Sequence, residues 1–364
     1  MELGVFLPTG SRGYIISTSA PANEPSYALN RHVVQTAERH GFGFALSMVK
    51  FRGFGGPSGF WDAALEPFTL VSALAAVTSR IRLISTAASL AMPPAVVARM
   101  AATMDGVAPG RIAINVITGW ARAEYEQMGL WPGEAHFARR YDMVAEYVAV
   151  MRDLWTTGRC DLAGEFFRMQ DCVLEPRPLH PVPIVVAGSS DKGLDFAARH
   201  ADYNFCSAPD AVNDPESCAV PVQRLRAAAA RHGRDVKALL WVTVITDATD
   251  AGAEAKWEEY RRGIDMQAIG RRVGQAAADT VTVDPASTAF RHRGAEVAPV
   301  GGCKLVGSHA TIAAQLDRLA AIPDLAGVML AFDDYWTGLD EFGKRVLPLM
   351  RARRGMQGAE SGAA

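Results

Sequence analysis

The sequence predicts an α/β protein that folds as a (β/α)8 TIM barrel. Along almost all of the 364 residues, short runs rich in β-branched and aromatic residues alternate with segments whose apolar residues have helical spacing. This alternation is typical of parallel strands joined by crossover helices, and eight strand-like runs are the number that closes such a barrel. A doubly wound sheet would give the same alternation, but the chain has no GxGxxG motif opening a helix, so the barrel is favoured.

Each expected strand is a short apolar run between turn residues. The eight strands are Leu3–Leu7, Phe44–Val49, Ile81–Ser89, Ile112–Ile117, Pro183–Ala187, Tyr203–Ser207, Leu239–Ile245 and Gly327–Phe332. Apolar residues three or four apart predict helices between them, most clearly at Leu29–His40, Glu66–Ser79, Ala95–Gly106, Arg140–Trp155 and Ala310–Ala321. We expect one barrel domain over residues 1–354 and a disordered tail over residues 355–364, which are mostly small and polar.

Three connections are longer than a minimal βα unit requires. Residues 51–65 form a Gly-rich aromatic segment after the second predicted strand, and residues 121–139 lengthen the connection after the fourth. Residues 270–303 form a Gly/Ala/Thr-rich stretch before the eighth strand, long enough to be functional or mobile rather than a plain connector. We therefore expect insertions at these three places.

Composition and charge exclude several classes of function. Lys and Arg number 37 and Asp and Glu 39, without a basic run, so we expect no nucleic-acid partner. No apolar run approaches the roughly 18–20 residues of a membrane helix, and the N-terminus has no signal-peptide pattern. The five cysteines are scattered without CxxC spacing, which indicates a reducing cytoplasm and no zinc site. The histidines are dispersed and HExxH, GxSxG and P-loop motifs are absent, so we expect no metal site and no hydrolase triad.

Polar residues at strand ends are the first candidates for a site, because ligands bind at the C-terminal rim of a parallel barrel. Lys50 closes the second predicted strand, Thr86 lies within the third and Asn115 within the fourth. The three side chains could line one wall of a pocket. Alternatively, Thr86 forms only a local hydrogen bond and Lys50 reaches to solvent. Asn115 lies between two apolar residues, where an unpaired amide costs a few kcal/mol, so the functional interpretation is favoured for the trio.

Two further groups follow strand ends. Trp120 and Glu124 are four residues apart and would share a face if residues 120–128 were helical; a core-packing Trp with a solvated Glu is equally compatible. Arg140 and Tyr141 lie at a predicted helix start, and Ser190 opens the helix after the fifth strand. Helix starts bind anions, although serines there are most often plain N-caps. Together these residues indicate a flat ligand with one phosphate.

At this point the chain resembles the pyrimidine monooxygenases of the bacterial-luciferase-like flavin monooxygenase superfamily. The resemblance rests on residues 45–56, 74–83, 93–105, 115–133, 139–148, 305–320 and 327–335, and so extends over nearly the whole chain. It implies a (β/α)8 barrel that uses reduced FMN and O2 to open the ring of uracil, and of thymine, to a ureidoacrylate-type product. It also implies a separate NADH-dependent flavin reductase as partner. We further expect a homo-oligomer, located in the cytoplasm.

The resemblance also assigns roles to residues. FMN contacts are implied for Val49, Lys50, Asn115, Glu124, Arg140, Tyr141 and Ser190. Thr86 and Asn115 are the implied catalytic residues, forming a polar niche for O2, and Trp120 and Glu124 are the implied border of the pyrimidine pocket. Residues 208–222 and 270–300 follow the family pattern poorly. A related enzyme acting on another small heterocycle or a sulfur compound therefore stays open. A flavin-binding protein without turnover and a deazaflavin-dependent dehydrogenase are further alternatives.

Overall fold

The computed structural model describes residues 1–208, 210–287, 290 and 299–353. The tail expected over residues 355–364, and part of the stretch over residues 270–303, lie outside the described residues. Within the described part of the chain, helices are too short or too polar to cross a lipid bilayer.

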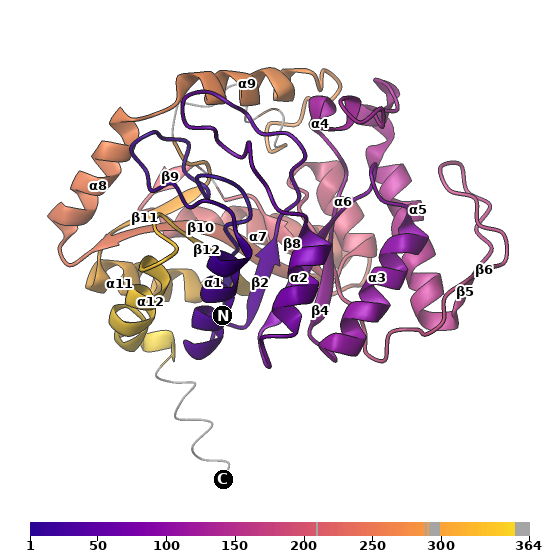
Figure 1. Ribbon diagram of the computed structural model, residues 1–364, viewed down its shortest axis with the longest axis horizontal. Coiled ribbons are helices and arrows are strands. Elements are labelled where there is room, and N and C mark those ends of the chain that lie inside the picture. The colour runs from indigo at the N-terminus through magenta and orange to yellow at the C-terminus, as the bar shows by residue number, and fades with distance from the viewer. Residues whose placement is uncertain (209, 288–289, 291–298, 354–364) are drawn as a thin grey trace, which may run out of the picture.

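The core of the molecule is a closed parallel barrel (Figure 1). Its strands, in order around the barrel, are β1 (Glu2–Phe6), β2 (Phe44–Ser47), β3 (Arg82–Ala88), β4 (Ile112–Ile117), β7 (Ile184–Val186), β8 (Tyr203–Cys206), β10 (Lys237–Asp247) and β12 (Leu325–Phe332). Parallel pairing of β12 with both β1 and β10 closes the ring. Each predicted strand corresponds to one of these, with ends that agree within two residues, so the predicted fold class is confirmed.

Glycines on two strands make room for one large ring inside the barrel. A Cβ atom on Gly4 would lie 2.2 Å from the Phe44 ring, and one on Gly327 would lie 3.1 Å from it. Because β1 and β12 both contact Phe44, this ring must point into the barrel. Side chains alternate along a strand, and strand partners in register share a face. Phe44 pairs with Arg82, so Arg82 and Thr86, four residues later on the same strand, point inward as well. Thr86 pairs with Asn115, which therefore also points inward.

Helices surround the barrel on its outside. They are α1 (Tyr27–Arg39), α2 (Pro67–Ala75), α3 (Pro94–Val107), α5 (Ala135–Thr157), α6 (Asp191–His200), α7 (Ala219–Arg231), α11 (His309–Ala320) and α12 (Gly338–Arg345), with 3-10 turns at Pro215–Cys218 and Leu347–Leu349. The predicted helices are confirmed, with two boundary errors of more than two residues. The helix predicted over Glu66–Ser79 ends four residues earlier, at Ala75. The helix predicted to start at Arg140 begins five residues earlier, at Ala135, because the preceding loop ends at Gly133 in the left-handed region, with φ of 99°.

The long connections fold in different ways. Residues 51–65 form turns and isolated bridges, and the connection after β4 contains the short helix α4 (Arg122–Glu126). The connection between β10 and β12 contains α8 (Asp250–Arg262), α9 (Met266–Ala277) and a strand the sequence analysis did not identify, β11 (Cys303–Ser308). β11 extends the sheet beside the outer half of β10 and pairs with β9 (Ala211–Val212). A small hairpin, β5 (Arg159–Cys160) with β6 (Cys172–Val173), follows α5 outside the barrel.

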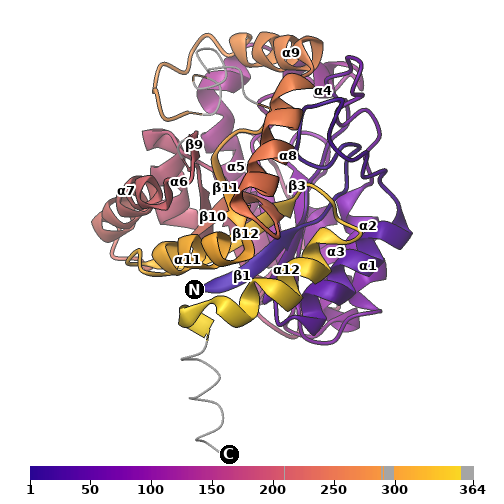
Figure 2. The ribbon, with the colours of Figure 1, turned by 90° about the vertical axis from the view of Figure 1, so that its left-hand side faces the viewer.

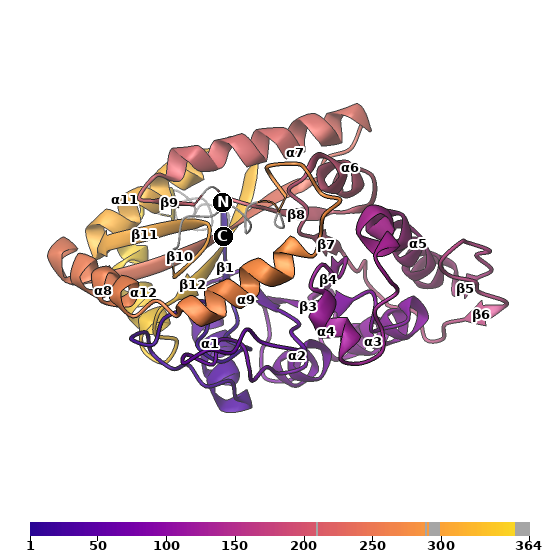
Figure 3. The same ribbon diagram turned by 90° about the horizontal axis from the view of Figure 1, so that it is seen from above.

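Helix α9 covers the carboxyl ends of the barrel strands. Figure 2 shows α8 rising from the barrel to α9, and Figure 3, seen from above, shows α9 lying across the barrel mouth. Ala268 and Ile269 of α9 pack with Phe54 and Phe60 of the 51–65 loop in one hydrophobic cluster. Helix α9 and the 51–65 loop, which lie about 200 residues apart in the chain, thus cover the mouth together.

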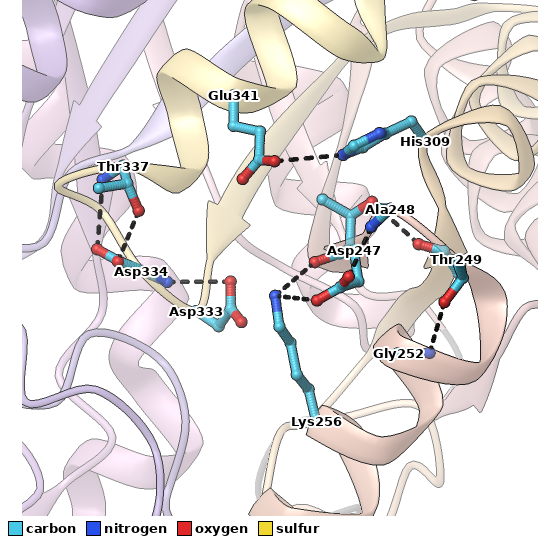
Figure 4. Close-up of polar contacts among 12 residues, drawn as sticks. Asp247, Ala248, Thr249, Gly252, Lys256, His309, Asp333, Asp334, Thr337 and Glu341 are labelled. Carbon is cyan, nitrogen blue, oxygen red and sulfur yellow. Dashed lines mark hydrogen bonds and ion pairs between the residues drawn. The ribbon is translucent and has the colours of Figure 1, made fainter.

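A polar cluster at the ends of β10 and β12 anchors α8 (Figure 4). Lys256 Nζ lies 2.9 Å from Asp247 Oδ2, and Tyr260 donates a hydrogen bond of 2.8 Å to Asp333 Oδ2. Burial raises the pKa of the Asp333 carboxyl, and the Tyr260 hydroxyl opposes that shift by stabilising the charged form. These groups pair with one another, so the cluster fixes the helix that carries α9 over the mouth.

Candidate active site

Thr86 and Asn115 form a polar pair inside the barrel. The Asn115 Nδ2 group donates to Thr86 Oγ1 at 3.1 Å, and Thr86 Oγ1 donates its own proton to the Ser47 carbonyl at 2.7 Å. This chain of bonds fixes the direction of the amide. Among the described residues, the buried Asn115 Oδ1 has no hydrogen-bond partner. An unsatisfied buried acceptor costs roughly 1–3 kcal/mol, so this oxygen is suited to a ligand that offers an N–H group.

Lys50 and Glu124 form a buried ion pair beside this wall. Lys50 Nζ contacts Glu124 Oε1, and the backbone N–H of Phe51 donates to Glu124 Oε2 at 3.1 Å. The two side chains are only 5% and 9% exposed, so Lys50 does not reach to solvent and Glu124 is not solvated. Burial lowers the pKa of the Lys50 ammonium, and the charge of Glu124 opposes that shift.

The expected end of the second strand was wrong. β2 ends at Ser47, because its pairing with β1 stops at Leu46 and its pairing with β3 stops at Ser47. Lys50 therefore lies three residues beyond the strand. Val49, the other implied FMN contact here, is half-buried in the same segment.

Trp120 reaches the site, but not through a shared helix. Helix α4 starts at Arg122, so the prediction that Trp120 and Glu124 share a helix face is wrong. The reason is Gly119, whose φ of 71° turns the chain and where a Cβ atom would lie 2.8 Å from Leu90. Trp120 instead meets Glu124 through Lys50, whose Nζ is 5.9 Å from the Trp120 ring centroid.

Aromatic rings from the 51–65 loop complete this wall. Lys50 Nζ lies 4.3 Å from the centroid of Phe54 and 5.6 Å from that of Trp61. Cations within about 6 Å of a ring face are attracted to it. The ammonium is therefore held by one carboxylate and a group of rings, which keeps a charged site in a dry environment.

Arg140, Tyr141 and Ser190 lie on α5 and at the start of α6. Ser190 is the N-cap of α6, its Oγ accepting from the backbone N–H of Gly193 at 3.1 Å. Tyr141 packs on this first turn, since a Cβ atom on Gly193 would lie 2.6 Å from its hydroxyl. Arg140 lies in the second turn of α5, not at its start. Its Nη1 atom is 3.1 Å from Asp279 Oδ2.

The structure thus brings the predicted residues into two groups. One consists of the barrel pair with Lys50, Glu124 and Trp120 at the ends of β2, β3 and β4, and the other of the α5 and α6 residues. Both groups lie toward the carboxyl ends of the strands, where a parallel barrel binds its ligands. A cofactor with a ring in the barrel and a phosphate at α6 fits this arrangement.

The sequence interpretation missed polar residues on α9 and β10. Arg272 Nε and Gln275 Oε1 are buried and lack a hydrogen-bond partner within the described residues, as are Trp241 Nε1 and Thr243 Oγ1 of β10. Burial lowers the pKa of the Arg272 guanidinium, which nevertheless keeps its charge at neutral pH. Gln275 lies three residues after Arg272, so the two share a helix face. Helical spacing of Ala268, Arg272 and Ala276 was the signal that could have revealed this face.

Comparisons with known proteins agree with this geometry. The family model described as luciferase-like monooxygenase matches residues 1–324. The pyrimidine monooxygenase RutA of Rhizobium rhizogenes is 48% identical over 353 residues, which are 97% of each chain. The protein of the same name from Methylobacterium radiotolerans is 50% identical over 363 residues, covering 97% of this chain and 93% of its own.

Solved structures show the same fold at lower identity. Riboflavin lyase RcaE, with modified FMN and riboflavin, has a TM-score of 0.83 at 21% identity and covers 97% of this chain and 92% of its own. DmoA from Hyphomicrobium sulfonivorans has a TM-score of 0.77 at 23% identity, covering 97% and 88%. The resemblance inferred from the sequence is confirmed: the chain belongs to the luciferase-like monooxygenase family and is an oxidoreductase.

Proposed function

We propose that this protein is a two-component, FMN-dependent monooxygenase that uses reduced FMN and O2 to open the ring of uracil, and of thymine, to a ureidoacrylate-type product. The observation that carries the proposal is the Thr86–Asn115 pair, which leaves one buried acceptor, Asn115 Oδ1, unpaired inside the barrel. The name of the relatives, pyrimidine monooxygenase, supports the substrate class.

The residues present fit a flavin. Asn115 Oδ1 would accept from an N–H group of the reduced ring, and the Thr86 hydroxyl would keep the amide in that orientation. Reduced FMN supplies the electrons that activate O2, so no protein nucleophile is needed. Lys50 and Glu124 would border the ring, with the surrounding aromatic side chains excluding water.

The helix α6 start fits the phosphate of the cofactor. A Cβ atom on Gly188 would lie 2.8 Å from the backbone of Gly193, so glycine lets the β7–α6 turn close tightly. Backbone N–H groups at a helix start bind anions. Ser190 caps this one, Tyr141 packs on its first turn, and Arg140 precedes Tyr141 on α5. We propose that these three residues hold the phosphate of FMN.

The underside of α9 fits a heterocyclic amide. Arg272 offers hydrogen-bond donors and Gln275 offers an acceptor. The buried Arg272 Nε and Gln275 Oε1 atoms have no hydrogen-bond partner within the described part of the chain, while the charge of Asp210 acts on the guanidinium. Uracil carries alternating carbonyl and N–H groups, which need donors and an acceptor of this kind. We propose that Arg272 and Gln275 face the substrate, with Trp120 and Glu124 at its border.

The reductase and the cellular setting belong to the same proposal. The chain carries no GxGxxG motif for a bound dinucleotide, and we propose that reduced FMN comes from a separate NADH-dependent flavin reductase in the cytoplasm. The expectations of a single barrel domain with a disordered tail and of a homo-oligomer remain predictions.

A substrate panel tests the proposal. The purified protein is incubated in air with NADH, FMN and a flavin reductase, and each compound's loss is followed by chromatography. We expect uracil and thymine to disappear while sulfones and alkanesulfonates persist. Consumption of another heterocycle or of a sulfur compound instead of uracil would identify a related enzyme. No consumption of any compound, despite FMN binding, would indicate a flavin-binding protein without turnover.

A further inference from the structure

The segment after α9 places one carboxylate on Arg140 and a second at the start of α6, the two parts of the proposed phosphate site. Asp279 Oδ2 lies 3.1 Å from Arg140 Nη1, with both side chains buried. Five residues later, Asp284 Oδ2 accepts a hydrogen bond of 2.6 Å from the backbone N–H of Asp191, the first residue of α6. We name residues 279–284 the carboxylate strap.

Each carboxylate is fixed by a backbone N–H two or three residues further along the chain and presents one oxygen to the site. The Thr282 backbone N–H donates to Asp279 Oδ1 at 3.0 Å, which leaves Asp279 Oδ2 for Arg140 and for the Thr282 hydroxyl at 2.7 Å. The Ala286 backbone N–H donates to Asp284 Oδ1 at 2.8 Å, which leaves Asp284 Oδ2 for α6. The strap is thus folded around its two negative charges.

The two positive partners of the strap belong to one place. Tyr141, next to Arg140 in the chain, packs its ring 5.6 Å from Phe196 of α6, and its hydroxyl lies against Gly193 in the first turn of that helix. Arg140 and the α6 start, which carries a partial positive charge, are thus connected twice, by Tyr141 next to Arg140 on α5 and by the strap, which contacts both. This combination attracts a phosphate monoester dianion, and carboxylates cannot occupy it at the same time without charge repulsion.

We propose that the carboxylate strap is an internal stand-in for the cofactor phosphate, which occupies Arg140 and the α6 start until FMN displaces it. The inference rests on the proposed FMN function. Displacement makes the net affinity for FMN weaker than the phosphate contacts alone would give, which suits a protein that takes up reduced flavin from a separate donor. Because the strap directly follows α9, phosphate binding is linked to the helix that covers the mouth.

Alternatively, the strap stays in place when FMN binds, and Asp279 only orients Arg140 for the phosphate. The two roles predict opposite effects. If the strap competes, weakening its hold tightens FMN binding; if it orients, the same change loosens FMN binding or leaves it unaltered. Asp284→Asn is the variant of choice, because asparagine keeps an oxygen for the Asp191 N–H but removes the charge, and it leaves the buried Arg140–Asp279 pair intact.

Binding is measured on the full chain by quenching of flavin fluorescence, without turnover. Wild type, Asp284→Asn and a control, Asp235→Asn, are each titrated with FMN and with riboflavin, which lacks the phosphate. Asp235 is exposed and pairs with Lys237 away from the strap. We expect Asp284→Asn to bind FMN about three- to tenfold more tightly, with riboflavin binding unchanged and the control equal to wild type.

Hydrogen exchange of residues 278–287 gives the second readout. We expect the exchange of these amides in wild type to become faster when FMN is added and to stay the same with riboflavin. Unchanged or weaker FMN binding by Asp284→Asn, or slower exchange with FMN, would overturn the inference while leaving the proposed function intact. Failure of wild type to bind FMN at all would overturn both.

Discussion

Asn115 donates to Thr86 across two neighbouring strands, and the bond leaves the amide oxygen of Asn115 unpaired inside the barrel. Because the Thr86 proton is committed to the Ser47 carbonyl, the hydroxyl can only accept from Asn115, and the amide cannot turn its oxygen toward it. The orientation is therefore set before any ligand arrives. Preorganised polar groups of this kind do not have to reorganise when a reaction occurs.

Replacing Asn115 by leucine tests this pair. We expect Asn115→Leu to lower the rate of uracil oxygenation by about 100-fold, in the range found when one preorganised hydrogen-bonding group is removed. The free energy of unfolding should be unchanged or higher, because the variant removes an unsatisfied buried acceptor. Turnover and urea denaturation are measured together.

Ser85→Ala is the matched control for this test. Ser85 is buried on the outer face of the same strand as Thr86, where its hydroxyl donates to the Pro67 carbonyl. The control should keep its turnover. If Asn115→Leu oxygenated uracil at the wild-type rate, the Thr86–Asn115 pair would have no role in the reaction.

The Lys50–Glu124 pair predicts an asymmetric effect on stability. Lys50→Met leaves Glu124 as a buried charge without its counter-ion, which typically costs about 3–5 kcal/mol. The double variant Lys50→Met, Glu124→Gln should recover most of this loss, since glutamine still accepts from the Phe51 N–H. Chemical denaturation of wild type, both single variants and the double variant measures the coupling. Equal stability of Lys50→Met and wild type would show that the pair is not held as described.

Gln275 on α9 predicts a specific effect on substrate binding. Gln275→Leu removes the acceptor proposed to face the substrate, so we expect the KM for uracil to rise about three- to tenfold, the effect of losing one hydrogen bond of roughly 1 kcal/mol. FMN binding should not change. Gln267→Leu, on an exposed position of the same helix, is the control. A rise in KM in both variants would point to the stability of α9 and not to substrate contact.

His200 predicts part of the pH dependence of stability. Burial, together with the charges of Arg199, Arg152 and Arg234, lowers its pKa from 6.5 to about 4. Between these values the unfolded chain binds the proton and the folded chain does not, so stability is fully present above pH 6.5 and falls as the pH drops toward 4. We expect His200→Gln to lose less free energy of unfolding than wild type between pH 7 and pH 5, as measured by urea denaturation. An identical slope in His200→Gln and wild type would contradict this assignment.

Much of the barrel could be predicted, because its signals are local. Alternating apolar runs gave all eight barrel strands within two residues, and the amide of Asn115 stood out as a polar group within an apolar strand. The boundary errors have local causes too. The left-handed conformations of Gly119 and Gly133 decide where Trp120 points and where α5 begins. The sequence alone does not show which loop glycines adopt a positive φ.

The remaining features depend on long-range contacts. Arg140 lies near its predicted phosphate site, but its partner in the structure, Asp279, lies 139 residues further along the chain. Likewise, Arg272 and Gln275 become buried only because α9 lies over the barrel mouth. Tertiary packing decides such contacts. Helical spacing can mark the face of α9 that becomes buried, but it does not tell which part of the chain that face covers. β11 was missed although it is longer than β7 and β8, because it lies beside the barrel and the eight predicted strands already close the ring without it.

The most direct test of the central claim uses labelled oxygen. The full-length protein, FMN, NADH and a flavin reductase are incubated with uracil under molecular oxygen-18, and the product is analysed by mass spectrometry. We predict a ring-opened product that carries one labelled oxygen atom, formed by wild type and by Ser85→Ala but strongly diminished in Asn115→Leu. Oxidation of reduced FMN with intact uracil, or a ring-opened product without the label, would contradict the account.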